Sequence, residues 1–398
     1  MPTDFASLRA QFDLPEGMIY LDGNSLGPLP KAAAARVAHT ITQEWGKLLI
    51  TGWNKAGWMA QPSAVGDRIA KLIGAEPGSV VMGDTLSIKV YQALASALEM
   101  NPKRRVILSD TGNFPSDLYM ATGLCRTLGP DYILKTVAPE DVLDAIDDTV
   151  AVTLLTEVDY RTGRLHDMQT ITERAHALGA LTVWDLAHTA GALPVHLAKC
   201  RADFAIGCTY KYLNSGPGGP AFIYVAPRHQ DTARPALSGW LGHAAPFAFD
   251  LDYQPGVGIE RMRVGTPPVL QLAALEASLD IWDQADINDV RAQSIALTDR
   301  FINGVEAACP TLTLASPRDG TKRGSQASFR HPEGYAIMQA CIAHGVIGDF
   351  RAPDILRFGF TPLYTSEQDV DSAVKILTNI IANTLWDRPE YKTRARVT

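Results

Sequence analysis

The sequence predicts an α/β fold, a mainly parallel sheet covered by helices, followed by a smaller α+β C-terminal domain. From about residue 80, short apolar runs alternate with amphipathic stretches such as SIKVYQALASALEM, PEDVLDAIDD and MQTITERAHALGA. Near-continuously apolar strands separated by helices are typical of parallel sheets with both faces covered. Beyond about residue 271, long helical stretches surround a few short apolar runs, which predicts the second domain. The predicted strands of the sheet are 80–82, 105–108, 132–134, 150–155, 181–184 and 221–225.

The composition excludes several classes of protein. The 398 residues carry a net charge of −7 and contain no run of Lys or Arg, so nucleic acid and anionic membranes are unsuitable partners. The 5 cysteines are scattered and form no C-x-x-C pair, which argues against a disulfide framework or a zinc site. The N-terminus does not resemble a secretory signal, and no apolar run approaches the ~20 residues of a membrane span. We expect a cytoplasmic protein without a metal ion.

The first predicted strand leads into Gly83-Asp84-Thr85-Leu86-Ser87, which opens a helix. Ligands of α/β sheets bind outside the carboxyl ends of the strands, and a helix N-terminus carries partial positive charge. The backbone N–H groups and the Ser87 hydroxyl are therefore candidates for binding an anion. The alternative is a plain helix cap formed by Thr85 or Ser87.

The next strand ends bring further candidate side chains. Phe114 lies in the loop after the second strand, and Thr156 and Tyr160 follow the fourth. Asp185 ends the fifth strand, where a buried carboxylate requires a partner. Phe114 could instead belong to the core, and Asp185 to a structural salt bridge. A metal site made of Asp185 and His188 is disfavoured because no third ligand follows at a suitable spacing.

Lys211 stands in the stretch TYKYLNSGPGGP (209–220), after an apolar run and before a glycine-proline loop. Lysine in apolar surroundings has a depressed pKa and becomes a nucleophilic amine, as a Schiff base with an aldehyde cofactor requires. The glycine loop matches neither nucleotide-binding pattern. An anion-binding helix start, an aromatic ring, an acid and a reactive lysine in this order predict a pyridoxal phosphate site.

Several motifs extend this interpretation over essentially the whole chain. They are YLDGNSLGPLP (20–30), NFPSD (113–117), DLAHTAGALPVHL (185–197), DFAIGCTYKYLNSGPGGPAF (203–222), LSGWLGH (237–243), RVGTPP (263–268) and LRFGFTPLY (356–364). On these motifs the sequence resembles the kynureninase family of fold-type I pyridoxal phosphate enzymes, to which DGNSLGP and the YKYLN-SGPGG run are specific. The resemblance implies a PLP-dependent transferase-like fold with a seven-stranded sheet in the large domain. It also implies an N-terminal segment (1–45) that contributes to the small domain and the active site, a large cofactor-binding domain (46–275) and a small C-terminal domain (276–398).

The resemblance assigns roles by matched position. Lys211 would hold the cofactor through its amine, Asp185 would pair with the pyridinium nitrogen, and Phe114 would stack on the ring. Lys211, Asp185 and Tyr210 are the catalytic candidates, and Tyr210 could also stabilise an oxyanion. The cofactor-binding candidates in the same subunit are Leu86 (through its backbone), Ser87, Phe114, Asp117, Thr156, Asp185, His188, Tyr210 and Lys211.

Further roles concern the substrate and a second subunit. Trp240 and Thr266 would reach the cofactor phosphate of the neighbouring subunit, which implies a homodimer with composite sites; core packing is the alternative for Trp240. Arg357 would clamp the substrate α-carboxylate with a bidentate guanidinium. Its alternative is a salt bridge to Asp354 or to a helix acid. Asn24 is a further substrate-side candidate, or only a turn former.

The implied activity is the hydrolytic Cβ–Cγ cleavage of L-kynurenine to anthranilate and L-alanine, in tryptophan catabolism or NAD biosynthesis. Animal members of the family tend to have Asn at the position of Thr266, and the resemblance to bacterial members at Gly265 and Thr266 implies L-kynurenine over its 3-hydroxy form. Trp53 and Trp58 could line an aryl pocket or simply pack. A cysteine desulfurase or selenocysteine lyase would need a mobile cysteine, whereas Cys341 lies in a predicted helix. A non-catalytic cofactor-binding homologue would be expected to lose Lys211 or Arg357.

Overall fold

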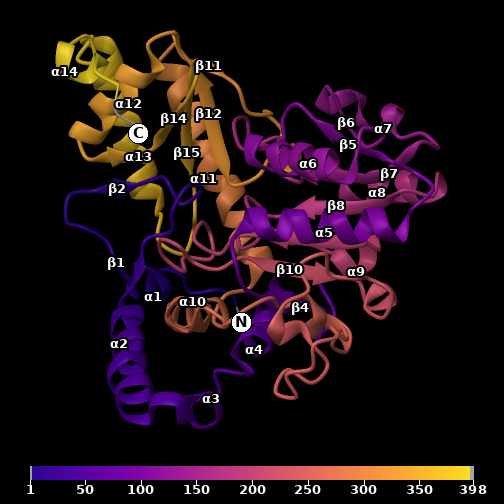
Figure 1. The fold of residues 1–398 in the computed structure, drawn as a ribbon. Helices are drawn as coiled ribbons and strands as arrows, with labels where there is room; N and C mark the ends of the chain where they lie inside the picture. Colours follow the sequence, from indigo (N-terminus) through magenta and orange to yellow (C-terminus); the bar gives the residue numbers. More distant parts are fainter. Residues whose placement is uncertain (1, 395–398) are drawn as a thin grey trace.

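A seven-stranded sheet forms the centre of the computed structural model, which describes residues 2–394 (Figure 1). The strand order is β4-β10-β9-β8-β7-β5-β6, and only β10 runs antiparallel to its neighbours. The mainly parallel sheet is thereby confirmed. The strands are β4 (Val80–Met82), β5 (Val106–Asp110), β6 (Ile133–Val137), β7 (Val150–Thr156), β8 (Leu181–Asp185), β9 (Phe204–Gly207) and β10 (Phe222–Val225).

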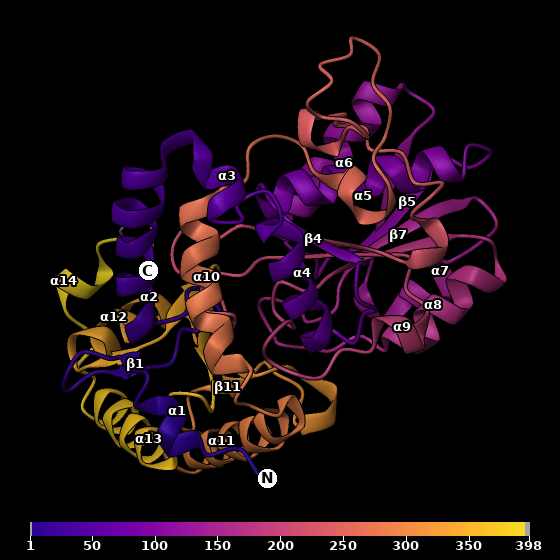
Figure 2. The same ribbon diagram turned by 90° about the horizontal axis from the view of Figure 1, so that it is seen from below.

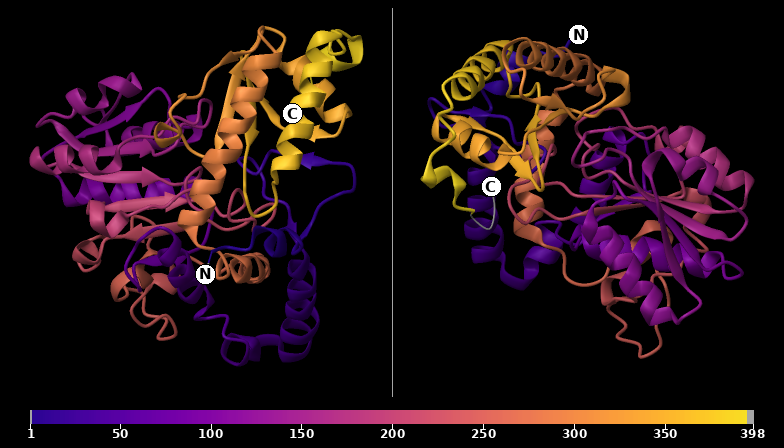
Figure 3. Two further views of the ribbon diagram at one scale, coloured as in Figure 1. Left: turned by 180° about the vertical axis from the view of Figure 1, so that it is seen from behind. Right: turned by 90° about the horizontal axis from the view of Figure 1, so that it is seen from above.

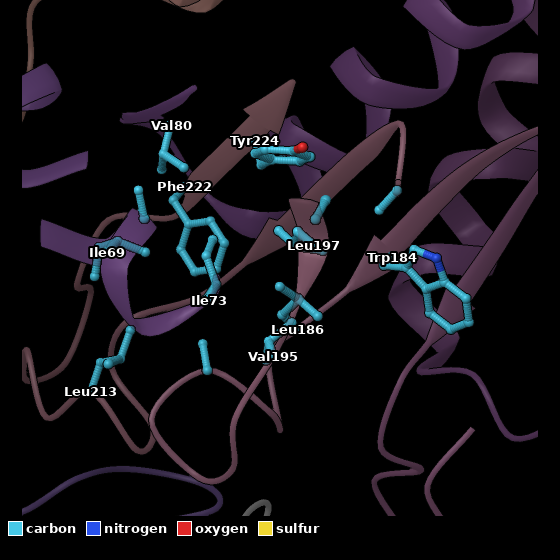
Figure 4. Packing of buried hydrophobic residues seen from close by; sticks show 14 of the residues in the cluster. Ile69, Ile73, Val80, Trp184, Leu186, Val195, Leu197, Leu213, Phe222 and Tyr224 are labelled. Atoms are coloured by element: carbon cyan, nitrogen blue, oxygen red, sulfur yellow. The ribbon is translucent and has the colours of Figure 1, made fainter. Parts of the chain in front are cut away.

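The strands are apolar on both faces because helices cover both. Successive side chains of a strand point to opposite sides, so Val80 and Met82 join one apolar cluster while Val81 joins the other. Figure 4 shows the first cluster, where Phe222 packs against Ile69 and Ile73. The first cluster includes residues of α4 (Gln61–Leu72), α7 (Val142–Ala145), α8 (Met168–Ala177), α9 (Leu197–Cys200) and α10 (Val269–Trp282), and the second those of α5 (Leu86–Met100) and α6 (Pro115–Leu128).

A four-stranded antiparallel sheet with the order β11-β12-β15-β14 forms the C-terminal part, with its own apolar core (Figure 3). Its long helices lie side by side on one side of the molecule. The elements are α11 (Ile287–Ala308), β11 (Thr313–Leu314), β12 (Gln326–Arg330), α12 (Gly334–Ala343), β13 (Val346–Ile347), β14 (Asp349–Arg351), β15 (Ile355–Gly359), α13 (Glu367–Ala382) and α14 (Pro389–Lys392).

The N-terminal segment joins the two parts. Its strand β2 (Ile19–Tyr20) pairs in parallel with β13. Helix α2 lies against α10, which stands between the two parts in Figure 2. The expected boundary after residue 275 falls inside α10, whose apolar residues belong to the core of the large sheet. The remaining elements of this segment are α1 (Phe5–Arg9), β1 (Phe12–Asp13), β3 (Leu29–Pro30), α2 (Lys31–His39), a π-helical continuation (Thr40–Leu48) and α3 (Gly52–Lys55).

The structure differs from the sequence prediction in two places. The predicted strands do not include β9. Its residues FAIG form an apolar run, which the prediction treats only as the stretch before the Lys211 loop. The stretch PEDVLDAIDD forms only a 3₁₀ turn and the short α7, since Asp147 and Asp148 lead directly into β7. No helix within residues 2–394 is both long and apolar enough to cross a bilayer. The 3₁₀ turns are Leu49–Thr51, Pro139–Asp141, Pro227–His229, Trp240–Gly242, Gly258–Met262 and Gly320–Lys322.

Candidate active site

Lys211 lies in the loop after β9 and is nearly buried, with 9% of its surface exposed. Its Nζ is 2.9 Å from Nε2 of His188. The same atom lies 5.9 Å from the ring centre of Phe114 and 5.8 Å from that of Tyr210, within the range of cation–π attraction. The neighbours of this amine are polar and aromatic. Among the described residues, no carboxylate lies within salt-bridge distance of it.

The turn YLDGNSLGPLP docks directly on this loop. The N–H of Gly27 donates to the carbonyl oxygen of Tyr210 over 2.7 Å. A side chain at Gly27 would come within 2.5 Å of the Lys211 carbonyl oxygen and 2.3 Å of Asn214 Oδ1, so only glycine fits there. The two motifs specific to the resemblance are therefore in contact, although about 180 residues separate them in the sequence.

Asp185 and Thr156 end the neighbouring strands β8 and β7 and stand directly opposite each other. Asp185 Oδ1 accepts a hydrogen bond from Ala187 N (2.8 Å), and Oδ2 lies 3.2 Å from the Thr156 hydroxyl oxygen. Burial raises the pKa of Asp185, and the nearby Lys211 charge opposes that rise. Asp185 forms no ion pair within residues 2–394, so the salt-bridge alternative is wrong.

Asp117 and His188 complete the buried polar wall around Lys211. Oδ2 of Asp117 and Nδ1 of His188 are buried and have no hydrogen-bond partner in the described chain. Burial and repulsion by Asp185 raise the Asp117 pKa well above its usual range. Burial and the Lys211 charge lower the His188 pKa, so this imidazole is neutral and its Nε2 can accept a hydrogen bond from the Lys211 amine. Buried polar atoms without partners are rare, and here two of them belong to side chains next to one lysine.

Asn113 is a site residue that sequence reasoning missed. Its Oδ1 accepts a hydrogen bond from the Thr156 hydroxyl (2.5 Å), and its Nδ2 donates to Ser109 Oγ (3.0 Å). It thereby fixes the Thr156 side chain beside Asp185. The signal was its place in NFPSD, directly before Phe114.

Two helix N-termini also belong to the site. Helix α5 begins after Thr85, whose side chain accepts no hydrogen bond from the helix, and its first turn contains no acid. The Ser87 hydroxyl instead lies 3.0 Å from that of Ser116, in the first turn of α6. The plain-cap alternative is therefore wrong, and the Leu86–Ser87 end of α5 remains available to an anion. Ser116 is a second residue that sequence reasoning missed.

Phe114 lies at the surface, not in the core. Its side chain is 39% exposed and touches Tyr160 edge-on with ring centres 5.1 Å apart. A ring so placed presents a face on which a planar group can stack. Together with the buried acids, the amine of Lys211 and the uncapped helix, it fits pyridoxal phosphate, which is cationic at its ring nitrogen and anionic at its phosphate.

Arg357 is fully buried on β15, beside Asp349 of β14 in the register of the small sheet. Its Nε donates to Asp349 Oδ1 over 2.6 Å, and its Nη2 donates to Asp349 Oδ2 and to Ser25 Oγ, the latter over 2.9 Å. Nη1 donates to the Tyr160 carbonyl oxygen. Arg357 does form a salt bridge, but its partner is Asp349 and not the expected Asp354. Asp354 pairs with Arg330 over 3.1 Å.

Asn24 lies on the same side of β15 as Arg357. A side chain at Gly359, two residues after Arg357, would come within 2.1 Å of Asn24 Oδ1. Asn24 is completely buried, and neither its Oδ1 nor its Nδ2 has a partner in the described chain. A mere turn former would not carry two unpaired buried polar atoms, so the geometry favours a ligand contact.

The structure does not bring Trp240 and Thr266 to Lys211 of the same chain. Trp240 is 40% exposed, which excludes simple core packing, and stacks edge-on with Trp53 at 6.5 Å. Thr266 is exposed and lines a small cavity with Asp84. Trp53 also packs edge-on against Trp58 at 6.3 Å, as the packing alternative for this pair predicts.

The cysteines argue against thiol chemistry. Cys341 is buried in α12 within the core of the C-terminal part, and burial raises its pKa to about 12. Cys208 lies near the site but is also buried, with its Sγ 3.9 Å from the Ala187 carbonyl oxygen, and burial raises its pKa. Both thiols are therefore poor sources of the thiolate that is the nucleophile.

Known proteins are similar to this chain in sequence. A kynureninase from Burkholderia pseudomallei (strain K96243) is 52% identical over 99% of this chain and 96% of the relative. One from Pseudomonas fluorescens is 51% identical with the same coverage. The family model of the kynureninase C-terminal domain matches residues 290–377.

Solved structures resemble the fold at low sequence identity. The apo cysteine desulfurase from Thermococcus onnurineus NA1 has a TM-score of 0.80 at 19% identity, covering 96% of this chain and 99% of that one. A C-DES mutant with glycine covalently linked to its PLP cofactor has a TM-score of 0.79 at 18% identity, covering 93% and 99%. These likenesses concern the fold alone. The near full-length identity of about half the residues is decisive, and the chain belongs to the kynureninase family.

Proposed function

We propose that this protein binds pyridoxal phosphate on Lys211 and hydrolyses L-kynurenine to anthranilate and L-alanine. The observation that carries the proposal is a nearly buried lysine amine surrounded by a neutral imidazole and two buried acids. The relatives named kynureninase support the choice of reaction. The enzyme is then a hydrolase of carbon–carbon bonds, acting in tryptophan catabolism or NAD biosynthesis.

Different residues of the site would contact different parts of the cofactor. Asp185 would face the ring nitrogen, and Phe114 would lie against the ring. The α5 N-terminus at Leu86 and Ser87, with Tyr210, would hold the phosphate, while Asp117, Thr156 and His188 would surround the ring. Bound pyridoxal phosphate supplies an electron sink for the bonding pairs released from the substrate.

Proton transfer belongs to Lys211 and its neighbours. The Lys211 amine would be the base that takes the proton from the substrate Cα. Neutral His188, 2.9 Å away, can accept a hydrogen bond from that amine and hold its orientation. The Tyr210 hydroxyl stays protonated because a neighbouring thiol and burial raise its pKa, so it can donate a hydrogen bond to the developing γ-oxyanion.

The substrate side of the site centres on Arg357 and Asn24. A buried guanidinium is the natural partner of an α-carboxylate, and the unpaired amide of Asn24 provides a donor and an acceptor beside it. Because Asp349 occupies the Nε–Nη2 edge of Arg357, the substrate must use Nη1 or displace the Ser25 and Tyr160 contacts. Gly265 and Thr266 support L-kynurenine as the preferred substrate.

A homodimer with composite sites is part of the proposal. Trp240 and Thr266 are exposed and would contribute to the cofactor phosphate site of a second copy. Large apolar side chains gather near Trp240 and in the stretch 45–53, which contacts Trp240 through Trp53, as is typical of an interface. Those exposed by more than half are Trp45, Leu49, Ile50, Phe247, Phe249, Leu251 and Val257.

The domain division and location complete the proposal. We place the N-terminal segment at 1–45, the large domain at 46–275 extended to the end of α10, and the small domain after it. Helix α10 is continuous, and its buried residues belong to the core of the large sheet. Both observations support extending the large domain to the end of α10. The scattered free cysteines support a reducing, cytoplasmic location.

Anthranilate fluorescence tests the activity. The purified protein, supplied with pyridoxal phosphate and L-kynurenine, should release fluorescent anthranilate and one L-alanine for each. A visible absorbance band that borohydride removes, without anthranilate, would keep the cofactor and reject the substrate. Mixing inactive Lys211→Ala and Trp240→Ala proteins should restore part of the activity if the sites are composite; no restoration would argue for independent sites.

A further inference from the structure

A second carboxyl group stands beside the ion pair of Arg357 and Asp349. Asp22 belongs to the turn YLDGNSLG, and its carbonyl oxygen accepts hydrogen bonds from Ser25 N (2.9 Å) and Leu26 N (3.0 Å). The adjoining Leu21 is hydrogen-bonded to Ile347 on one side and to Gly359 on the other, so the turn is wedged into the small sheet. Oδ1 of Asp22 is buried and has no partner in the described chain.

The hydroxyl of Ser25 joins the charged groups of this cluster. It donates to Asp349 Oδ2 over 2.6 Å and accepts from Arg357 Nη2 over 2.9 Å. Arg351 Nη2 also contacts this carboxylate, 2.7 Å from Asp349 Oδ2, and lies 3.4 Å from Ser25 Oγ. Arg357 has five N–H donors, and four of them are directed to these partners or to Tyr160. The guanidinium is therefore held in one orientation by Asp349 and Ser25.

The charges of the cluster determine which state of Asp22 suits a bound carboxylate. With both acids ionised, two carboxylates balance Arg351 and Arg357. A third carboxylate, that of the substrate, would leave an uncompensated negative charge in a mostly buried place, which is costly. With a proton on Asp22, the cluster has one excess positive charge, and the substrate carboxylate neutralises it.

We propose that Asp349 is the positioning residue of Arg357 and that Asp22 takes up one proton from solvent when the substrate carboxylate reaches this guanidinium. The inference rests on the proposed function, because it assumes that Arg357 receives a carboxylate. Binding and proton uptake are then linked, so the affinity for a carboxylate ligand falls as the pH rises through the Asp22 pKa.

The groups that face Asp22 from each neighbouring element support this direction. Burial and Asp349 of β14 raise its pKa to about 7, whereas Arg357 of β15, Ser25 and Arg351 oppose the rise. The phenols near it remain neutral because burial raises the pKa of each. These phenols are Tyr20, Tyr212 and Tyr364.

A pair of small probes isolates the carboxylate. L-Alanine and L-alaninol both have the amine, but only L-alanine has a carboxylate. The ratio of their inhibition constants against the holoenzyme therefore removes the pH dependence that both probes have in common. In the wild type, the inhibition constant of L-alanine divided by that of L-alaninol should rise as the pH rises above 7. The rise should be at most about tenfold for each pH unit. In Asp22→Asn, which mimics the protonated acid, the ratio should stay low and nearly constant from pH 6 to 9. Asp354→Asn, a nearby acid paired with Arg330, should keep the wild-type profile.

Each result bears on the inference. An unchanged pH profile in Asp22→Asn, or loss of L-alanine binding at every pH, overturns it. If Asp22→Asn does not fold, the wild type alone decides: the binding enthalpies of the two probes at pH 7.5, in two buffers of different ionisation enthalpy, should show more proton uptake for L-alanine. Equal uptake overturns the inference. Absence of anthranilate from L-kynurenine in the wild type would instead reject the proposed function.

Discussion

The two ends of the candidate site differ in how their central cations are paired. The Lys211 amine has the neutral His188 imidazole within hydrogen-bond distance and no carboxylate within salt-bridge distance in the described chain. The Arg357 guanidinium already holds Asp349, Ser25 and Tyr160, although Asp22 and Asn24 beside it keep unpaired buried atoms. The Lys211 amine can therefore bond a resident group directly, whereas Arg357 must exchange a partner when substrate arrives. The difference indicates which end holds a cofactor and which end selects a substrate that comes and goes.

The largest expected effect comes from the Lys211 end. Replacing Lys211 by Ala should lower turnover of L-kynurenine by at least about 10³-fold, because the attachment point and the base are lost together. Anthranilate release and borohydride labelling of the protein measure the two losses. Lys199→Ala, an exposed lysine of α9, is the control and should behave as wild type. Substantial turnover in Lys211→Ala would contradict the assignment.

Arg357→Lys should be less damaging, since the charge remains while the planar fork is lost. We expect kcat/KM to fall by about 10²-fold, chiefly through KM, because the change removes ground-state as well as transition-state binding. Steady-state kinetics with L-kynurenine measure the split. Arg330→Lys, whose pairing with Asp354 is partly exposed, should leave both constants near wild type. A fall in kcat alone would place Arg357 with the chemistry and remove the distinction between the two ends.

Ser25→Ala should have a smaller effect at the same end. The hydroxyl contributes one hydrogen bond to each member of the Arg357–Asp349 pair, and one such bond is worth about 1–2 kcal/mol. We expect KM to rise by about tenfold with kcat nearly unchanged. Ser7→Ala, on the exposed face of α1, is the control. An unchanged KM would show that Asp349 orients Arg357 without help.

The smallest effect on activity is expected at Glu157, a buried acid that follows Thr156 and whose Oε2 lacks a partner. Burial raises its pKa from 4.5 to about 8. A raised carboxyl pKa means that the folded protein prefers the protonated acid, so stability is lost as the pH rises from about 4.5 to about 8. Glu157→Gln should leave activity unchanged and raise the free energy of unfolding at pH 9, by at most about 5 kcal/mol.

Denaturant unfolding at pH 5 and pH 9 measures this difference, which should be small at the lower pH. Asp144→Asn, in the first turn of the exposed short helix α7, should show no such pH dependence. Loss of activity in Glu157→Gln would mean that this buried acid belongs to the Lys211 end of the site and not only to the fold.

The sequence by itself determined the alternation of strands and helices, and it singled out Lys211, Asp185 and Phe114. It could do so because apolar periodicity and a lysine in apolar surroundings are local features. The seven-stranded order, with β9 inserted and β10 reversed, arises from packing between distant segments and leaves no local trace.

Only the tertiary structure decided which groups meet. Ser25 and Asp349 are more than 300 residues apart and hydrogen-bonded, and Asn113 was found only through its contact with Thr156. Partners of this kind are fixed by the docking of the N-terminal turn and by strand register, which depend on the whole folded chain. The burial of Asp22 beside Asp349 has the same origin, because desolvation is a property of the packed molecule and not of any sequence motif.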